Sequence, residues 1–225
     1  MFDIRRPLVG ALLLLCVTVS FAARGIAPPK LNAELMQSRQ DSSHFTLAMW
    51  LSAEMFRSSV AATMKPGDAQ RVVDALKGYQ IYGVIDATID GEKASIIAAD
   101  RAQLRASARL QLGDRAPRAA VPVAELPSSV QAAVEVLKPM MASLLGKFGD
   151  SMEFIVFKDA DEHGNSIADP RSDLVTTLSF DKESFTWRLP LVSLLPLRVD
   201  AATGDTFPGD YAFSPFTGNK LAVQK

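Results

Sequence analysis

The sequence is poor in the side chains on which most metal and nucleophile sites depend. Among its 225 residues are one cysteine and two histidines. The cysteine, Cys16, lies near the N-terminus, so the chain beyond it can form neither a disulfide nor a thiolate site. Two histidines supply too few ligands for a typical zinc site without thiolates. The sequence therefore argues against zinc as a cofactor and against thiol catalysis.

The chain also lacks an excess of charge of either sign. Its 24 basic and 25 acidic residues give a net charge of −1, and no long run of like charge occurs. Nucleic-acid binding requires clustered basic residues, because contacts with phosphates supply much of the affinity. We therefore expect no nucleic-acid partner.

Sequence motifs of the common enzyme classes are missing as well. There is no G-x-S-x-G nucleophile elbow and no glycine-rich phosphate loop. Sites built from Asp, Glu, Tyr or Arg leave no local signature. The sequence therefore assigns no catalytic residue, favours a non-enzymatic protein and leaves enzymatic activity as an alternative.

The N-terminal segment has the composition of a secretory signal. Two arginines precede an apolar run over residues 8–19, and small residues follow up to Ala22. This order is typical of a cleaved signal peptide, so we predict that residues 1–22 direct export to the periplasm or the exterior. The alternative is that residues 8–23 stay uncleaved as an inner-membrane anchor, because the run falls just short of the ~20 residues that span a bilayer.

Composition divides the rest of the chain into three parts. Residues 23–43 are polar and are expected to form a loosely packed lead. Residues 44–198 carry the helix and strand patterns of one domain. Residues 199–225, called the tail below, are rich in turn-forming residues and aromatic rings.

Helix and strand patterns within the domain come in blocks. Alternation over residues 79–90 ends in an Asp-Gly turn and predicts a half-buried strand of a hairpin. Apolar residues at spacings of three and four over 128–148 predict a long helix, with Ser128 and Gln131 as its capping box. A three-stranded antiparallel meander is expected over residues 152–157, 174–180 and 185–189. This order predicts an α+β fold, with helices packed on antiparallel β-sheet and a small turn-rich C-terminal module.

One polar loop between two predicted strands holds the candidate metal ligands. Residues 158–170 include four carboxylates, and Asp159, Asp161 and Asn165 match oxygen-ligand positions of a calcium loop. Histidine and proline occupy two other positions where an EF-hand loop has oxygen ligands. An exposed polar turn is the alternative. A hydrolase with its acid and base among the carboxylates of residues 159–173 is another.

The tail contains two copies of one short sequence motif. The patterns D-x-x-T-G and S-P-x-T-G begin at Asp200 and Ser214, fourteen residues apart. The tail resembles a zinc ribbon, in which two C-x-x-C-G knuckles bind the metal. The four cysteine positions are held here by Asp200, Thr203, Ser214 and Thr217. The resemblance covers about 25 residues and implies two tight turns and a small β-hairpin module.

Zinc is not implied by this resemblance, because one carboxylate and three hydroxyls are poor ligands for that ion. The stabilising role of the metal would have to pass to Phe207, Tyr211, Phe213 and Phe216 packing on the body of the protein. An unrelated tail of tight turns is the alternative.

Trp187 and Arg188 are the candidate partner-binding residues, because Trp and Arg often dominate interface energetics. The alternative is that Trp187 points into the core.

By elimination, the sequence favours a non-enzymatic envelope protein that binds a partner protein or another envelope component. A carrier of an apolar ligand, the remaining alternative, needs a large apolar cavity beneath Val134, Leu137 and Met141.

Overall fold

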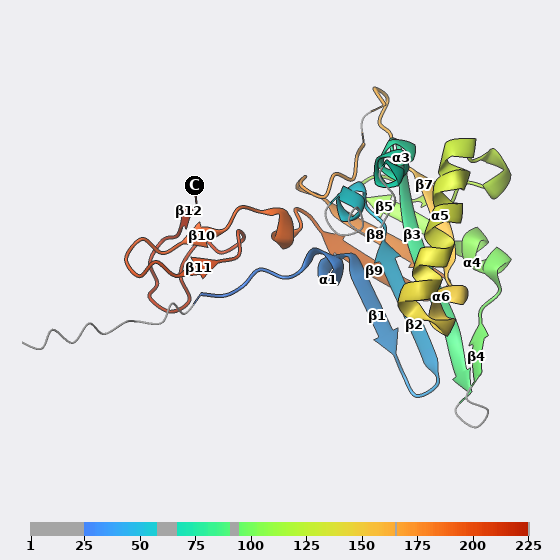
Figure 1. The fold of residues 1–225 in the computed structure, drawn as a ribbon, viewed down its shortest axis with the longest axis horizontal. Helices are drawn as coiled ribbons and strands as arrows, with labels where there is room; N and C mark the ends of the chain where they lie inside the picture. Colours follow the sequence, from blue (N-terminus) through green and yellow to red (C-terminus); the bar gives the residue numbers. More distant parts are fainter. Residues whose placement is uncertain (1–24, 58–66, 91–94, 165, 225) are drawn as a thin grey trace, which may run out of the picture.

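The computed structural model describes residues 25–57, 67–90, 95–164 and 166–224, so the predicted signal segment lies outside the described residues. A body of helices and antiparallel sheets is joined to the smaller tail (Figure 1). The predicted α+β class is therefore confirmed. No helix in this part of the chain is both long enough and apolar enough to cross a membrane.

The first sheet of the body is centred on strand β3 (Tyr79–Asp90). Its strands follow the order β1-β2-β3-β4, and β7 also pairs with β3; all of these pairs are antiparallel. The other strands of this sheet are β1 (Met36–Gln40), β2 (His44–Trp50), β4 (Ser95–Ala98) and β7 (Glu153–Lys158). The last four residues of β3 pair with β4, which confirms the predicted hairpin partner.

The second sheet has the order β6-β5-β8-β9. Its strands are β5 (Arg109–Leu112), β6 (Arg118–Ala119), β8 (Val175–Phe180) and β9 (Glu183–Arg188). A two-residue turn joins β8 to β9, with Asp181 at φ 46°. The predicted three-stranded meander is wrong, because β7 pairs with β3 and not with β8. The long loop after β7 lets the chain cross from one sheet to the other.

Strand β3 is buried on both faces, which corrects the prediction of a half-buried strand. Residues 80–85 are all buried. On one face, a Cβ added to Gly83 would lie 2.5 Å from Sδ of Met152, just after the helices. On the other face, the Tyr82 ring lies 5.3 Å from the Trp187 ring of the second sheet. The second sheet covers the face that would otherwise meet solvent.

Helices α5 (Ser128–Leu145) and α6 (Lys147–Asp150) cover the opposite face of the first sheet (Figure 1). The other helices are α1 (Leu31–Leu35), α2 (Ala53–Met55), α3 (Asp68–Ala75) and α4 (Arg101–Ser107), and the 3-10 turns are η2 (Val123–Glu125) and η3 (Val192–Leu194). The predicted long helix is α5, which buries Leu137 and Met141 but leaves Leu144 68% exposed. The predicted capping box is absent, because the Gln131 side chain donates to the Leu126 carbonyl at 2.8 Å.

Part of the predicted loose lead belongs to the body. Residues 31–40 form α1 and β1, and Leu35 is fully buried. Side chains of β1 also bind the free edge of the second sheet. Gln37 donates to the Thr186 carbonyl at 2.8 Å, and Arg39 donates to the Ser184 carbonyl at 2.5 Å. These contacts satisfy backbone groups of edge strand β9 that would otherwise be open to pairing.

The tail has a sheet and a small core of its own. Strand order is β11-β10-β12, with β10 (Arg198–Val199), β11 (Thr206–Phe207) and β12 (Ala222–Val223). Phe207 is fully buried, and its ring lies 6.2 Å from Tyr211 and 5.9 Å from Phe216. The expectation that the tail aromatics pack on the body is corrected for these three rings, which pack on one another.

Replacing Trp187 tests its place in the core. Trp187 is 2% exposed, and its indole N–H donates to the Leu35 carbonyl at 3.2 Å. Trp187→Ala should lower the free energy of unfolding by about 3–5 kcal/mol, because a buried ring is lost. Arg188→Ala, at the exposed next residue, should change it by less than about 0.5 kcal/mol. Urea unfolding followed by circular dichroism compares the two; equal effects would contradict this assignment.

Candidate functional site

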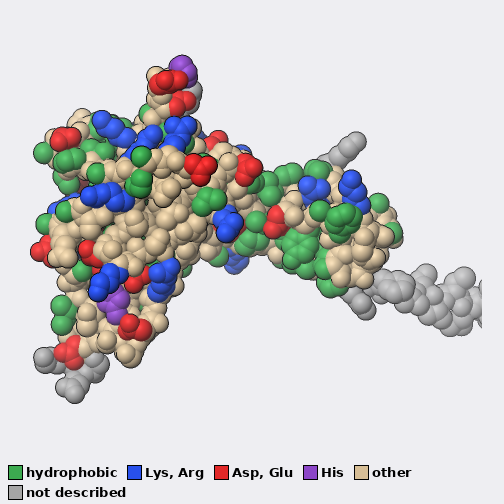
Figure 2. Space-filling view, turned by 180° about the vertical axis from the view of Figure 1, so that it is seen from behind, with side chains coloured by type: hydrophobic (Ala, Val, Ile, Leu, Met, Phe, Trp, Pro, Cys, Tyr) green, Lys and Arg blue, Asp and Glu red, His purple; other side chains and the backbone are tan. Residues whose placement is uncertain are grey.

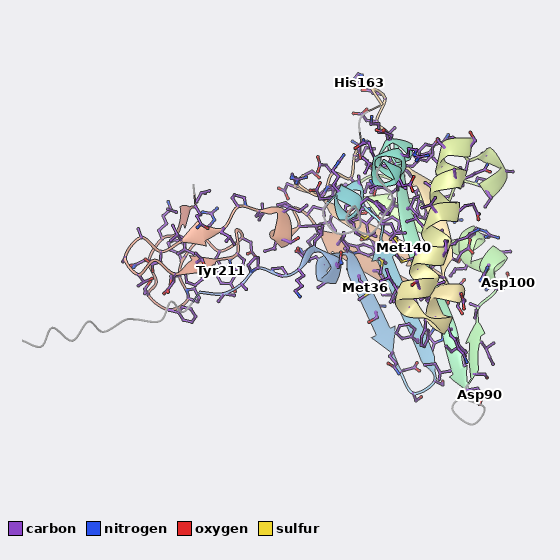
Figure 3. All side chains as sticks on the ribbon, in the orientation of Figure 1. Met36, Asp90, Asp100, Met140, His163 and Tyr211 are labelled. Carbon is purple, nitrogen blue, oxygen red and sulfur yellow. The ribbon has the colours of Figure 1, made fainter. Side chains whose placement is uncertain are left out.

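The polar loop after β7 leaves the body as a narrow projection. A bridge between Ala160 and Ser166 closes its base, and His163 lies at its far end (Figure 3). Asp161 accepts a hydrogen bond from the His163 backbone N–H at 2.8 Å. Asn165, the third predicted calcium ligand, lies outside the described residues.

Asp159 points inward from this loop and is fully buried. Its Oδ2 accepts hydrogen bonds from Gln80 Nε2, at 2.5 Å, and from the Ser166 hydroxyl. Its Oδ1 accepts the backbone N–H groups of Ile167 and Ala168 at 3.1 and 2.9 Å. A carboxylate offers about four acceptor positions. Four donors of the chain itself occupy them, so Asp159 anchors the loop instead of presenting oxygens to an ion or substrate.

The buried network continues into the first sheet. Gln80 lies on β3, and its side-chain oxygen accepts a hydrogen bond from the Trp50 indole on β2. The loop is thus tied to two neighbouring strands by polar contacts that satisfy one another. Within the described residues, no three His, Cys, Asp or Glu side chains gather closely enough to hold a metal ion.

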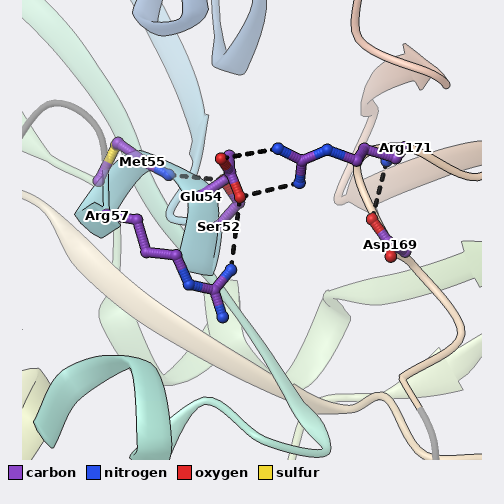
Figure 4. Close-up of polar contacts among 6 residues, drawn as sticks. All are labelled: Ser52, Glu54, Met55, Arg57, Asp169 and Arg171. Carbon is purple, nitrogen blue, oxygen red and sulfur yellow. Dashed lines mark hydrogen bonds and ion pairs between the residues drawn. The ribbon is translucent and has the colours of Figure 1, made fainter. Parts of the chain in front are cut away.

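A second contact that the sequence did not reveal joins α2 to the same loop. Arg171 donates from Nη1 and Nη2 to the two carboxylate oxygens of Glu54, each at 2.9 Å (Figure 4). Arg57 adds a longer contact at 3.4 Å. The hydrogen bonds from Arg171 lower the pKa of the Glu54 carboxyl, and those to Glu54 raise the pKa of Arg171. The pair is therefore ionised at neutral pH.

Local structure places both members of this ion pair. Ser52 caps the short helix beside Glu54 by accepting the Met55 backbone N–H at 3.3 Å. Asp169 accepts the Arg171 backbone N–H at 2.8 Å and so shapes the turn that carries the guanidinium. Because the Arg171 side chain is 54% exposed, we expect the pair to contribute on the order of 1 kcal/mol or less.

A small hollow of about 200 Å³ lies beside this pair. Residues of the buried network and of the ion pair line it, among them Trp50, Gln80, Glu54 and Arg171. Each of these four side chains binds another group of the chain. These contacts connect the loop to the first sheet. None of the four side chains is assigned a catalytic role.

The groove along α5 does not resemble an apolar carrier site. Its volume is about 600 Å³, and its lining includes Arg101, Lys138 and Glu135 as well as Val134. Leu137, which a carrier would use, is fully buried. A site for an apolar ligand is predominantly apolar and encloses most of the ligand surface. The charged side chains of this groove do not match that description.

His44 and Asp86 meet on the face of the first sheet that lies toward the second sheet. Their strands pair antiparallel, and His44 Nε2 lies 2.9 Å from Asp86 Oδ1. Burial raises the pKa of the Asp86 carboxyl, and the charges of Asp181 and Glu183 act in the same direction, whereas His44 opposes them. A raised pKa means that the folded protein favours the protonated form of the Asp86 carboxyl. The contribution of Asp86 to the free energy of unfolding therefore falls as pH rises through the raised pKa.

The two repeated turns of the tail meet through one buried carboxylate. The Gly204 N–H donates to the Asp200 carbonyl at 2.8 Å, and the Gly218 N–H donates to the Ser214 carbonyl at 2.9 Å. The Asp200 carboxylate accepts the Thr217 hydroxyl of the other turn at 2.6 Å. The structure therefore brings two of the four predicted ribbon positions into contact.

Asp200 has further partners that keep it ionised. Its carboxylate accepts the Ala202 backbone N–H at 3.0 Å and the Asn219 side-chain amide at 3.2 Å. The hydrogen bond from Thr217, above all, lowers the pKa of the Asp200 carboxyl. Its contribution to the stability of the tail is present above the ordinary Asp pKa and is lost as pH falls through the lowered one.

The other two ribbon positions bind within their own turns. Thr203 donates its hydroxyl proton to Asp205 Oδ2 at 2.9 Å, and the Ser214 hydroxyl accepts the Thr217 N–H at 3.3 Å. Asp200 and Asp205 are both buried.

No family model matches the chain, and neither a curated protein nor a solved structure matches it.

Replacement of Asp159 tests its role as the anchor of the loop. In Asp159→Asn, an amide group would face the donors Gln80 and Ser166, so the free energy of unfolding should fall by about 1.5–3 kcal/mol. Asp161→Asn keeps its acceptor for the His163 N–H and should change stability by less than about 0.5 kcal/mol. Thermal unfolding with and without calcium measures both. A calcium-dependent rise in Tm that Asp159→Asn abolishes would support the calcium hypothesis instead.

Proposed function

We propose that the protein is an exported, non-enzymatic component of the cell envelope that binds a partner protein or another envelope component through its tail. Support for export comes from the sequence of residues 1–22, which has the order of a signal peptide. Support for a binding role comes from the surface of the tail.

The observation that carries the binding role is a pair of exposed phenylalanines. Phe213 is 59% exposed and Phe216 is 53% exposed, and Val223 adds another exposed apolar side chain. Hydrophobic side chains gather on the tail in Figure 2, where the tail lies beside the body. Exposed apolar side chains that cluster on a small module are typical of an interaction surface. Phe rings contribute large contact areas to such surfaces.

The two alternatives have less support from the geometry. A hydrolase at residues 159–173 would need an accessible carboxylate pair. Asp159 is instead occupied by four internal donors, and its neighbour in the loop, Asp161, binds the turn at the tip. A carrier would need an enclosed apolar cavity, whereas the α5 groove is open and has charged side chains in its lining.

The tail itself is proposed to be a zinc-ribbon-like module in which hydrogen bonds take the place of the metal. The repeated turns at Asp200 and Ser214 support this proposal, as does the contact between Asp200 and Thr217. A structural zinc ion joins two knuckles by coordination. One ionised carboxylate that accepts donors from the second turn can join them without any metal.

Restoring the four cysteines tests this proposal. A variant that combines Asp200→Cys, Thr203→Cys, Ser214→Cys and Thr217→Cys should bind one zinc ion and gain thermal stability with it. Cobalt substitution reports tetrahedral thiolate coordination by its visible absorption. A control with Ala201→Cys and Ala202→Cys in place of the first two substitutions keeps four thiols at the wrong spacing. Equal metal affinity in both variants would refute the ribbon proposal.

Photo-cross-linking in the host envelope tests the binding role. A photoreactive phenylalanine at Phe213 or Phe216 should form adducts, because these rings are exposed on the proposed interaction surface. The matched controls are Ile97 in β4, 58% exposed, and Leu144 in α5, 68% exposed, both on the body. Mass spectrometry of the adducts identifies protein or lipid. Adducts at all four positions, or at none, would contradict a binding role specific to the tail.

A further inference from the structure

The exposed aromatic rings lie in the tail, next to the place where the described chain begins. Among the described residues, the two exposed phenylalanines are Phe213 and Phe216, whereas none of the large apolar side chains exposed on the described body is aromatic. The Ile26 backbone N–H donates to the Thr206 carbonyl of β11 at 2.9 Å. The chain after the proposed signal segment is thus held against the tail before it reaches the body.

Close packing fixes this attachment. A Cβ added to Gly25 would lie 2.6 Å from the Thr206 carbonyl oxygen, so only glycine fits at this approach without a shift of the backbone. Residues 25–30 then run to α1 of the body (Figure 1). The point at which residues 1–24 join the described chain therefore lies beside β11 of the tail.

The length of the intervening chain limits how far the tail can lie from the apolar run. The run ends at Val19, six residues before Gly25. An extended chain advances at most about 3.6 Å per residue, so the two points are within about 20 Å of each other. If residues 8–19 lie in a bilayer, the tail is held close to the membrane surface.

We propose that residues 8–23 stay uncleaved as a membrane anchor, the alternative to cleavage given above, and that the aromatic surface of the tail, formed by Phe213 and Phe216, rests on the lipid surface of that membrane. This proposal rests on the envelope location proposed above and names the envelope component that the tail binds. Aromatic side chains favour the interfacial region of a bilayer, where a ring is partly removed from water.

One basic residue lies beside the rings. Lys220 lies opposite Phe213 in an antiparallel bridge and is exposed. A lysine beside a partly inserted ring can reach anionic headgroups while its methylene groups remain in the apolar layer. Asp210 is an exposed acidic residue of the tail. We therefore expect the ring contacts to dominate, with a smaller dependence on anionic lipid.

Tryptophan fluorescence in vesicles tests the lipid contact. The full chain is reconstituted in phosphatidylcholine and phosphatidylglycerol vesicles, with or without brominated acyl chains, as Phe213→Trp, Phe216→Trp or the control Ile97→Trp. The natural tryptophans, Trp50 and Trp187, are buried and give a constant background. Brominated lipid should quench the tryptophan introduced at 213 or 216 and leave the one at 97 unchanged.

Other outcomes overturn the proposal in distinct ways. Equal emission of all three variants in brominated and ordinary vesicles would exclude lipid contact by the tail. If cross-linking from Phe213 then yields protein adducts, the binding role stands with a protein partner, and only the lipid assignment fails. If the mass of the protein from its own envelope shows that residues 1–22 have been removed, the anchored arrangement is excluded, whereas the proposed envelope function is not.

Discussion

Packing around one tyrosine holds the layers of the body together. The Tyr82 ring on β3 lies 6.3 Å from Trp50 on β2, 6.0 Å from Phe157 on β7 and 5.3 Å from Trp187 on β9. Two of these rings belong to the first sheet and one to the second. Burial raises the pKa of the Tyr82 hydroxyl, which stays protonated and lies 3.4 Å from the Thr176 hydroxyl. This aromatic cluster joins strands β2, β3 and β7 of the first sheet to β9 of the second sheet.

The polar groups of the body serve the same arrangement. Trp50 also donates to Gln80, and Gln80 binds the carboxylate of Asp159, so the aromatic cluster and the buried network share a residue. Glu54 and Arg171 hold the outer side of the same loop. Asp159, a candidate calcium ligand by its sequence position, is thus used to anchor the loop to the body. The proposed recognition role is assigned to the tail, whose core residue Phe207 is buried while Phe213 is exposed.

Local patterns predicted most elements, and non-local contacts accounted for most errors. Alternation found the strand over residues 79–90 because period two is a property of the strand itself. The same pattern could not show that β7 pairs with β3, since pairing joins segments that are distant in the chain. Nor could it reveal the contact between Glu54 and Arg171, 117 residues apart. The sequence does not show whether Asp159 is buried or exposed. Only the fold shows that this carboxylate anchors the loop and is not available as a metal ligand. Each of the two turns in the tail is formed by residues close together in the chain, so the repeated motif could be found in the sequence.

The contact between Ile26 and Thr206 has a consequence for the order of folding. These residues are among the first and the last of the described chain, and their hydrogen bond joins segments that leave the ribosome far apart in time. Contacts of long sequence separation form late, because closing a large loop is entropically costly. The body can therefore assemble while the segment around Ile26 still has no partner. Completion of the tail would then fix the segment around Ile26 in place, so that a segment made late secures one made early.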